Sequence, residues 1–304
     1  MVKTIVLPLD GSHLAERALP YAATIARRTG ASIVLLEAVQ ADARSARDPS
    51  ASGGGATRPV DENLLSVASR LRADGVTATV HVSYADPVAA ILDAAQHHRA
   101  DLIVMSTHGR SGLGRMVYGS VADRVLHQAE VPVLLVPSIA DHTWPTDRPL
   151  TVLLPLDGSA WGEAALGALD TLPLLGPSGA EPLLLRIVET LGYTLWGKNY
   201  AYVAVDEAAA QATALSYLTG VAARLAERGY TPRVEVATAR SAESIANVAR
   251  DRGVDLIAMA THGRSGLVRA VMGSVATATV QRAGVPILLV RPDPVQSARV
   301  AGPE

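Results

Sequence analysis

The chain has 304 residues, enough for two average domains, and its 49% hydrophobic content is sufficient for two cores. It contains no cysteine, which excludes a disulfide framework and a thiolate metal site, and its net charge of −2 provides no electrostatic basis for binding nucleic acid or an anionic membrane. No apolar run is long enough to span a membrane and the first residues do not have the profile of a signal peptide, so we expect a cytoplasmic protein.

Two long stretches of the sequence occur twice. Residues 6–12, Val-Leu-Pro-Leu-Asp-Gly-Ser, return at 153–159 as Leu-Leu-Pro-Leu-Asp-Gly-Ser, and residues 100–125 return with most positions identical at 254–279. A period this long indicates a domain duplication rather than a solenoid. We therefore predict a first domain over 1–138, a linker over 139–148, a second domain over 149–292 and a tail over 293–304.

In the first copy, apolar strand patterns alternate with helical ones. The predicted helices begin at Ser12, Asn63, Asp86-Pro87 and Ser120, and the first two are closed by Gly30 and Gly75, residues suited to the end of a helix. The predicted strands are 4–9, 32–39, 77–83, 101–106 and 131–136.

The second copy follows the same plan, with strands at 151–156, 182–188, 232–237, 255–260 and 285–290 and helices between them. Alternating strands and helices with continuous apolar strands predict an α/β fold. We expect two tandem doubly wound, Rossmann-like domains, each with a five-stranded parallel sheet flanked by helices. Ligands of such sheets bind beyond the carboxyl ends of the strands.

A glycine-rich segment follows the fourth strand of each copy. Thr107-His108-Gly109 is followed by nine residues and then by Gly119-Ser120 at a helix start, and the second copy keeps this spacing from Gly263 to Gly273-Ser274. A phosphate chain needs unobstructed backbone N–H groups and the positive end of a helix dipole, which such a segment supplies. The alternative is that Ser120 is merely an N-cap, with Asp123 completing a capping box, and that the glycines make a tight turn.

At these residues the sequence resembles the universal stress protein family in its tandem two-domain form. The ATP-binding members of that family have Gly-x2-Gly-x9-Gly-Ser/Thr at this place, and both copies match it except at the first glycine, which is Ser106 or Ala260 here. The resemblance implies a fold similar to the adenine nucleotide alpha hydrolases, with an ATP site in each repeat. It also places Asp10 and Asp157 beside the ribose and the backbone of Ala38 and Ile187 at the adenine edge.

The expected nucleotide-binding residues form one set in each repeat. In the first repeat they are Pro8, Leu9, Asp10, Ala38, Ser106, His108, Gly109, Arg110, Gly112, Gly119, Ser120 and Val121. In the second they are Pro155, Leu156, Asp157, Ile187, Ala260, His262, Gly263, Arg264, Gly266, Gly273, Ser274 and Val275. We expect Mg²⁺ to be held through the phosphates, with Asp10, Asp157, Ser120 and Ser274 as candidate protein ligands.

Helix caps, a histidine pair, a long loop and an aromatic cluster complete the sequence pattern. Ser12 and Ser159 are predicted to cap helices, His97-His98 to lie at a solvated helix end, and 41–59 to form a mobile loop. The corresponding part of the second copy is rich in aromatic residues and is expected to cover the second site, to form an interface, or to pack under a loop. These aromatic residues are Tyr193, Trp196, Tyr200 and Tyr202.

Three functions follow from this pattern. The first is an ATP-binding regulatory or stress-response protein with at most slow hydrolysis; the second is an interaction module that keeps the fold without the ligand. The third, an adenine-nucleotide hydrolase, is weakest because the loop is accompanied by no clear general base, nucleophile or two-metal carboxylate cluster. The last strand of each copy is predicted to be a sheet edge, from which we expect an internal pseudo-dimer of the two domains and, as a further step, a homodimer.

Overall fold

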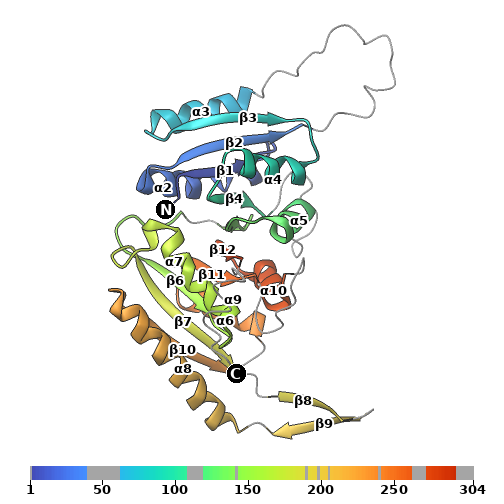
Figure 1. Ribbon diagram of the computed structural model, residues 1–304, viewed down its shortest axis with the longest axis vertical. Helices are drawn as coiled ribbons and strands as arrows, with labels where there is room; N and C mark the ends of the chain where they lie inside the picture. The colour runs from blue at the N-terminus through green and yellow to red at the C-terminus, as the bar shows by residue number, and fades with distance from the viewer. Residues whose placement is uncertain are drawn as a thin grey trace. The chain divides into compact units, whose positions relative to one another are not determined.

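The computed structural model describes residues 2–39, 62–107, 119–140, 143–188, 191–196, 199–204, 206–238, 241–261 and 272–291 (Figure 1). The chain divides into two compact units, Met1–Ser138 and Ile139–Glu304. The expected loop at 41–59 lies outside the described residues. Among the helices that the structure describes, none is both long and apolar enough to cross a membrane.

The first unit is a five-stranded parallel sheet with the order β5-β4-β1-β2-β3. Helix α2 contacts β1 and β2, α3 contacts β2 and β3, and α4 contacts β1, β2 and α5. The strands are β1 (Thr4–Pro8), β2 (Ser32–Ala38), β3 (Ala78–Ser83), β4 (Leu102–Ser106) and β5 (Val133–Val136). The helices are α1 (His13–Glu16), α2 (Leu19–Thr29), α3 (Glu62–Ala73), α4 (Pro87–His97) and α5 (Ser120–Gln128).

The second unit repeats this sheet with the order β10-β7-β6-β11-β12, again entirely parallel. Its strands are β6 (Leu150–Pro155), β7 (Ala180–Val188), β10 (Arg233–Thr238), β11 (Leu256–Ala260) and β12 (Ile287–Val290). Its helices are α6 (Ala160–Glu163), α7 (Ala168–Thr171), α8 (Glu207–Glu227), α9 (Ser241–Asp251) and α10 (Ser274–Arg282), with short 3-10 turns at Ala164–Gly167 and Pro173–Leu175. The prediction of two five-stranded, doubly wound parallel sheets is confirmed.

The central strands are buried because they are apolar on both faces, as a sheet covered by helices on both sides requires. Every residue of β4 and of β11 is buried. The helix ends also follow the sequence: Gly30 closes α2 in the left-handed conformation at φ +72°, and Asp86 caps α4 by accepting from the N–H groups of Val88 and Ala89. These local signals fix the end of α2 and the start of α4.

Two expected elements are different in the structure. The single helix predicted over 12–29 is two helices, because the chain turns at Arg17–Ala18 between α1 and α2. Pro20 suits only the first turn of a helix, and α2 begins there. In the second unit an antiparallel hairpin, β8 (Leu191–Trp196) and β9 (Asn199–Ala204), stands where a long loop rich in aromatic residues was expected. The hairpin contains the four aromatic positions noted above, with Tyr193 paired to Tyr202.

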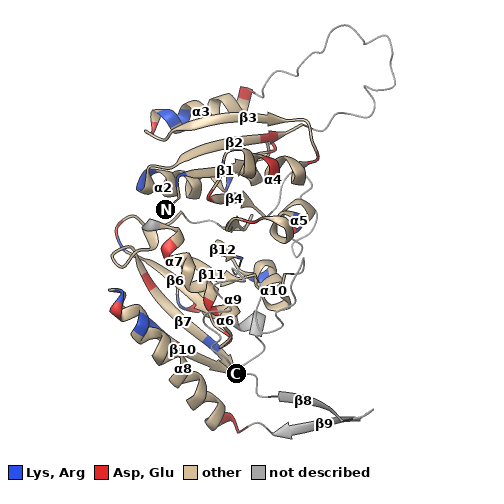
Figure 2. Cartoon of the chain, in the orientation of Figure 1, with Lys and Arg blue, Asp and Glu red and all other residues tan. Residues whose placement is uncertain are grey.

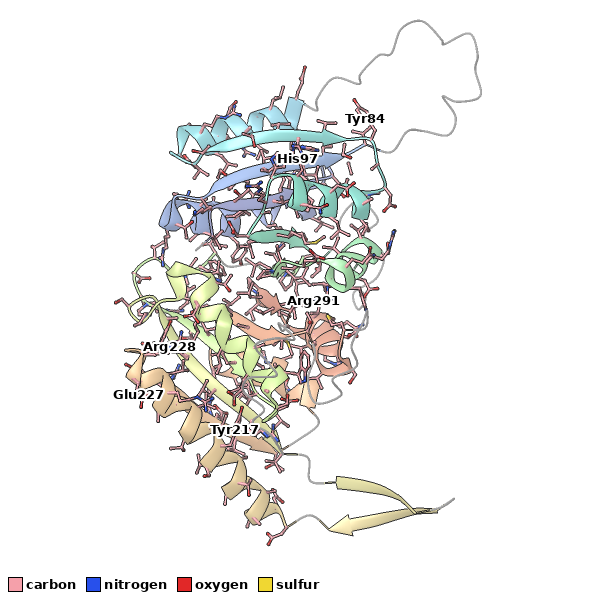
Figure 3. All side chains as sticks on the ribbon, in the orientation of Figure 1. Tyr84, His97, Tyr217, Glu227, Arg228 and Arg291 are labelled. Carbon is pink, nitrogen blue, oxygen red and sulfur yellow. The ribbon has the colours of Figure 1, made fainter. Side chains whose placement is uncertain are left out.

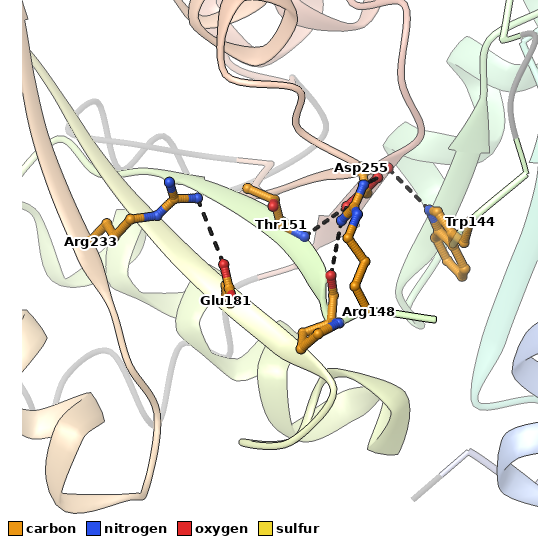
Figure 4. Close-up of polar contacts among 7 residues, drawn as sticks. Trp144, Arg148, Thr151, Glu181, Arg233 and Asp255 are labelled. Atoms are coloured by element: carbon orange, nitrogen blue, oxygen red, sulfur yellow. Dashed lines mark hydrogen bonds and ion pairs between the residues drawn. The ribbon is translucent and has the colours of Figure 1, made fainter. Parts of the chain in front are cut away.

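The segment predicted as a linker is attached to the second unit (Figure 4). The Trp144 indole N–H donates to the Asp255 carbonyl at 3.0 Å, and the indole is only 5% exposed. Arg148 donates to both carboxylate oxygens of Asp255 at 2.6 and 2.9 Å, and the Thr151 N–H donates to the same carboxylate at 2.8 Å. Residues 144–148 are therefore part of the folded second unit.

Candidate functional site

The candidate site of each unit lies at the point where the order of the strands reverses. Strand β1 pairs with β2 on one side and with β4 on the other, all parallel, so the carboxyl ends of these three strands share one edge. In the second unit β6 stands between β7 and β11 in the same way. Such a reversal leaves a crevice beyond the strand ends where ligands of doubly wound sheets bind.

The aspartate that follows the first strand is held by a tight turn. The Asp10 Oδ1 accepts from the Ser12 N–H at 3.0 Å and from the Ser12 hydroxyl at 2.6 Å, and the second unit has the same two distances between Asp157 and Ser159. The glycine between them is needed because the turn requires positive φ, +77° at Gly11 and +81° at Gly158. The carboxylate is thus fixed at the edge of the sheet in both units.

The serine of this turn is engaged by the helix that follows. The Ser12 hydroxyl accepts from the Ala15 N–H at 3.2 Å, and the Ser159 hydroxyl accepts from the Gly162 N–H at 3.0 Å. Both predicted N-caps are confirmed. Because each hydroxyl also donates to its aspartate, the serine serves the turn rather than a ligand.

The glycine after the long loop places a helix start against the end of the fourth strand. The Gly119 N–H donates to the Thr107 carbonyl at 2.7 Å, and the Gly273 N–H donates to the Thr261 carbonyl at 2.8 Å. A Cβ on Gly119 would lie 3.2 Å from that carbonyl oxygen, which is tighter than ordinary contact. A side chain there would push the helix away from the strand end.

The alternative that Ser120 caps α5 is wrong. Gly119 is the N-cap, with φ −61° and ψ 150°, no side-chain hydrogen bond caps the helix, and Ser120 is the exposed first helical residue. The same holds for Gly273 and Ser274 at the start of α10. The cap residue of each helix is therefore a glycine, which has no side chain to accept from the first N–H groups.

The structure thus brings together the described members of the predicted set. Pro8, Leu9, Asp10, Ala38, Ser106, Gly119, Ser120 and Val121 lie at adjacent strand ends or at the α5 start, and Pro155, Leu156, Asp157, Ile187, Ala260, Gly273, Ser274 and Val275 do so in the second unit. The predictions for His108, Gly109, Arg110, Gly112, His262, Gly263, Arg264 and Gly266 lie outside the described residues. Among the described residues, no group of histidine and acidic side chains is arranged to hold a metal ion by itself.

A glutamate one turn after the capping serine was not singled out from the sequence. In the second unit Glu163 accepts from the Tyr217 hydroxyl at 2.9 Å and from Arg224 at 2.5 Å, both on α8. Figure 3 labels Tyr217 on this helix. Burial, together with the negative charge of Glu163, raises the pKa of Tyr217. In the first unit Glu16 accepts from the Asn63 amide at 2.8 Å, with Arg70 at 4.0 Å, so a glutamate connects the turn to the next long helix in both units.

The fold and the position of the site define a doubly wound α/β domain that occurs twice in one chain. The family model of the universal stress protein family matches residues 1–137 and 150–291. The chain therefore belongs to the universal stress protein family.

Relatives and solved structures match this chain over nearly its full length. A universal stress protein of Mycobacterium bovis is 25% identical over 300 residues, covering 94% of this chain and 96% of the relative. One from Synechocystis is 25% identical over 315 residues, covering 95% of this chain and all of the relative. The crystal structure of a universal stress protein from Archaeoglobus fulgidus matches with a TM-score of 0.70 at 19% identity, covering 95% of this chain and 98% of that chain, which supports the fold.

Proposed function

We propose that each unit binds an adenine nucleotide, ATP with Mg²⁺, and that the protein is a regulatory universal stress protein with at most slow ATP hydrolysis. The observation that carries this proposal is the start of α5 and of α10. There the N-cap is a glycine, which has no side chain to occupy the first N–H groups, and its own N–H is hydrogen-bonded to the neighbouring strand end. Exposed N–H groups at the positive end of a helix dipole suit a phosphate chain.

The Asp-Gly-Ser turn supports the same ligand from the neighbouring strand. Because the Ser12 groups bind one carboxylate oxygen of Asp10, the orientation of that carboxylate is fixed where the ribose of a nucleotide would lie. A bound Mg²⁺ would neutralise phosphate charge, and the candidate protein ligands for it are the Asp10 and Asp157 carboxylates and the Ser120 and Ser274 hydroxyls. These hydroxyls lie on the first residue of α5 and α10 and are exposed.

The first experiment is to denature the purified full-length protein, identify released nucleotide by mass spectrometry, and measure thermal unfolding with and without ATP and Mg²⁺. A ligand at a hundredfold of its Kd stabilises the site by about 2.7 kcal/mol. We expect this stabilisation to be lost in the double variant Asp10→Asn with Asp157→Asn. An asparagine Oδ1 still accepts from the serine, so the turn is retained while the charge is removed.

The matched control is Asp93→Asn, an exposed residue within α4. This control should keep the full stabilisation by ATP. The proposal fails if the wild-type protein neither releases an adenine nucleotide nor gains stability with ATP, because the fold would then serve only as an interaction module. Steady ATP turnover well above that of the double variant would instead identify a hydrolase.

A further inference from the structure

The two candidate sites carry opposite charges at one equivalent position. The Leu9 N–H donates to the Leu36 carbonyl and the Leu156 N–H to the Leu185 carbonyl, each at 2.8 Å, so Leu36 and Leu185 correspond. The next residue along the strand is Glu37 in the first unit and Arg186 in the second. Both lie near the carboxyl end of the strand beside the Asp-Gly-Ser turn, and Figure 2 colours the acidic and basic residues of both strands.

Arg186 lies against this turn in the second unit. Its Nη1 donates to the Leu156 carbonyl at 3.1 Å, and the same atom is 3.4 Å from the position that a Cβ on Gly158 would occupy. The positive charge of the guanidinium also opposes burial and the negative charges of Glu163 and Asp157, which raise the pKa of the Tyr217 hydroxyl. A positive charge therefore stands next to the aspartate turn of the second unit.

The turn itself does not require this arginine. In the first unit, where Glu37 takes the place of Arg186, the Asp10–Ser12 hydrogen bonds have the same lengths, 3.0 and 2.6 Å, as those of Asp157–Ser159. The exchange of glutamate for arginine thus changes the charge beside the turn and leaves its geometry unchanged. The charge at this position is therefore not determined by the turn.

An acidic residue at the end of the second strand of a doubly wound sheet suits free ribose hydroxyls, whereas an arginine there suits a phosphate on the ribose. We propose that Arg186 and Glu37 are specificity-determining residues. The second site selects an adenine nucleotide that carries a phosphate on its ribose 2′ or 3′ oxygen, and the first site selects a nucleotide with free ribose hydroxyls. This inference rests on the proposed function, because it concerns the ligand of the same two sites.

The test compares three probes that each carry two phosphates: ADP, adenosine 2′,5′-bisphosphate and adenosine 3′,5′-bisphosphate. Calorimetric titration of the full-length protein should show ADP at both sites and one or both bisphosphates at a single site. Arg186→Gln should weaken that bisphosphate roughly tenfold, and ADP by clearly less, because only the bisphosphate places a charge beside residue 186. Arg186→Lys, which keeps the charge, should retain most of the preference.

Glu37→Gln tests the same idea without touching Arg186. Removal of the carboxylate should raise bisphosphate affinity at the first site, so that the number of bisphosphates bound approaches two. Thermal unfolding of each variant without ligand shows whether it is folded.

The inference is overturned if Arg186→Gln weakens ADP and the bisphosphates equally, because Arg186 would then act only on the turn. It is also overturned if the wild-type protein binds ADP and neither bisphosphate, a result that leaves the proposed function intact. If neither ADP nor ATP binds, both proposals fail together.

Discussion

The glutamate that joins the aspartate turn to the following long helix should contribute unequally in the two units. In the second unit, Glu163→Ala removes a bond from the half-buried Tyr217 hydroxyl to a carboxylate, worth about 1.5–3 kcal/mol. It also removes the contact with Arg224, whose side chain is 55% exposed and which therefore adds at most about 1 kcal/mol. We expect a loss of about 2–3 kcal/mol, or roughly 4–12 °C in the Tm of this unit.

The matched change in the first unit is Glu16→Ala, which should cost only about 1 kcal/mol. Its bond to the Asn63 amide is exposed, and Arg70 is 4.0 Å away, too far to add much. A second control is Asp170→Ala, which breaks only the exposed pair between Asp170 and Arg228 and should cost less than about 1 kcal/mol.

Calorimetry of the three variants gives the magnitudes, and hydrogen exchange followed by mass spectrometry assigns them to a unit. Faster exchange in Glu163→Ala should be concentrated in α8, and in Glu16→Ala in α3. The reasoning is refuted if Glu16→Ala is as destabilising as Glu163→Ala, or if exchange in α8 is unchanged in Glu163→Ala.

Two further predictions concern charges outside the sites. Burial and the charges of His81 and His97 lower the pKa of His98, whose Nε2 lies 3.1 Å from the His81 Nδ1, so the fold favours neutral His98. The stability that depends on neutral His98 is fully present above the ordinary histidine pKa of about 6.5. It is lost as the pH falls from there through the lower pKa of the folded state, so acid should lower the Tm of the first unit less in His98→Gln. Asp255→Ala should destabilise the second unit by about 1–3 kcal/mol, because the Thr151 N–H and Arg148 lose their acceptor. Urea unfolding measures this change, and an unchanged free energy of unfolding would contradict the prediction.

The sheet was predictable from the sequence because the central parallel strands are buried on both faces. Continuous apolar runs such as residues 102–105 have few other interpretations, and their alternation with helical spacing determines the topology. The end of α2 at Gly30 and the start of α4 at Asp86 were equally clear, since each depends on the conformation or side chain of one residue. Such features are local, and the sequence contains them directly.

Features that depend on contacts between distant residues were not predictable in the same way. The hairpin β8–β9 had a weak signal in Gly197-Lys198 between two aromatic-rich runs, but the general pattern favoured a loop. The choice of Gly119 over Ser120 as N-cap depends on the hydrogen bond to Thr107, which only the folded sheet provides. The contacts of Glu16 with α3 and of Glu163 with α8 likewise join residues far apart in the chain.

The attachment of residues 144–148 to Asp255 has a consequence for the duplication itself. In the first unit the equivalent carboxylate, that of Asp101, accepts from the Lys3 and Thr4 N–H groups at the very start of the chain. In the second unit the connecting segment adds Trp144 and Arg148 to this anchor. The duplicated repeat and the compact unit therefore begin at different residues. A second repeat produced alone from residue 150, where the family match begins, would lack Trp144 and Arg148 and leave the Asp255 carboxylate more exposed than in the whole chain.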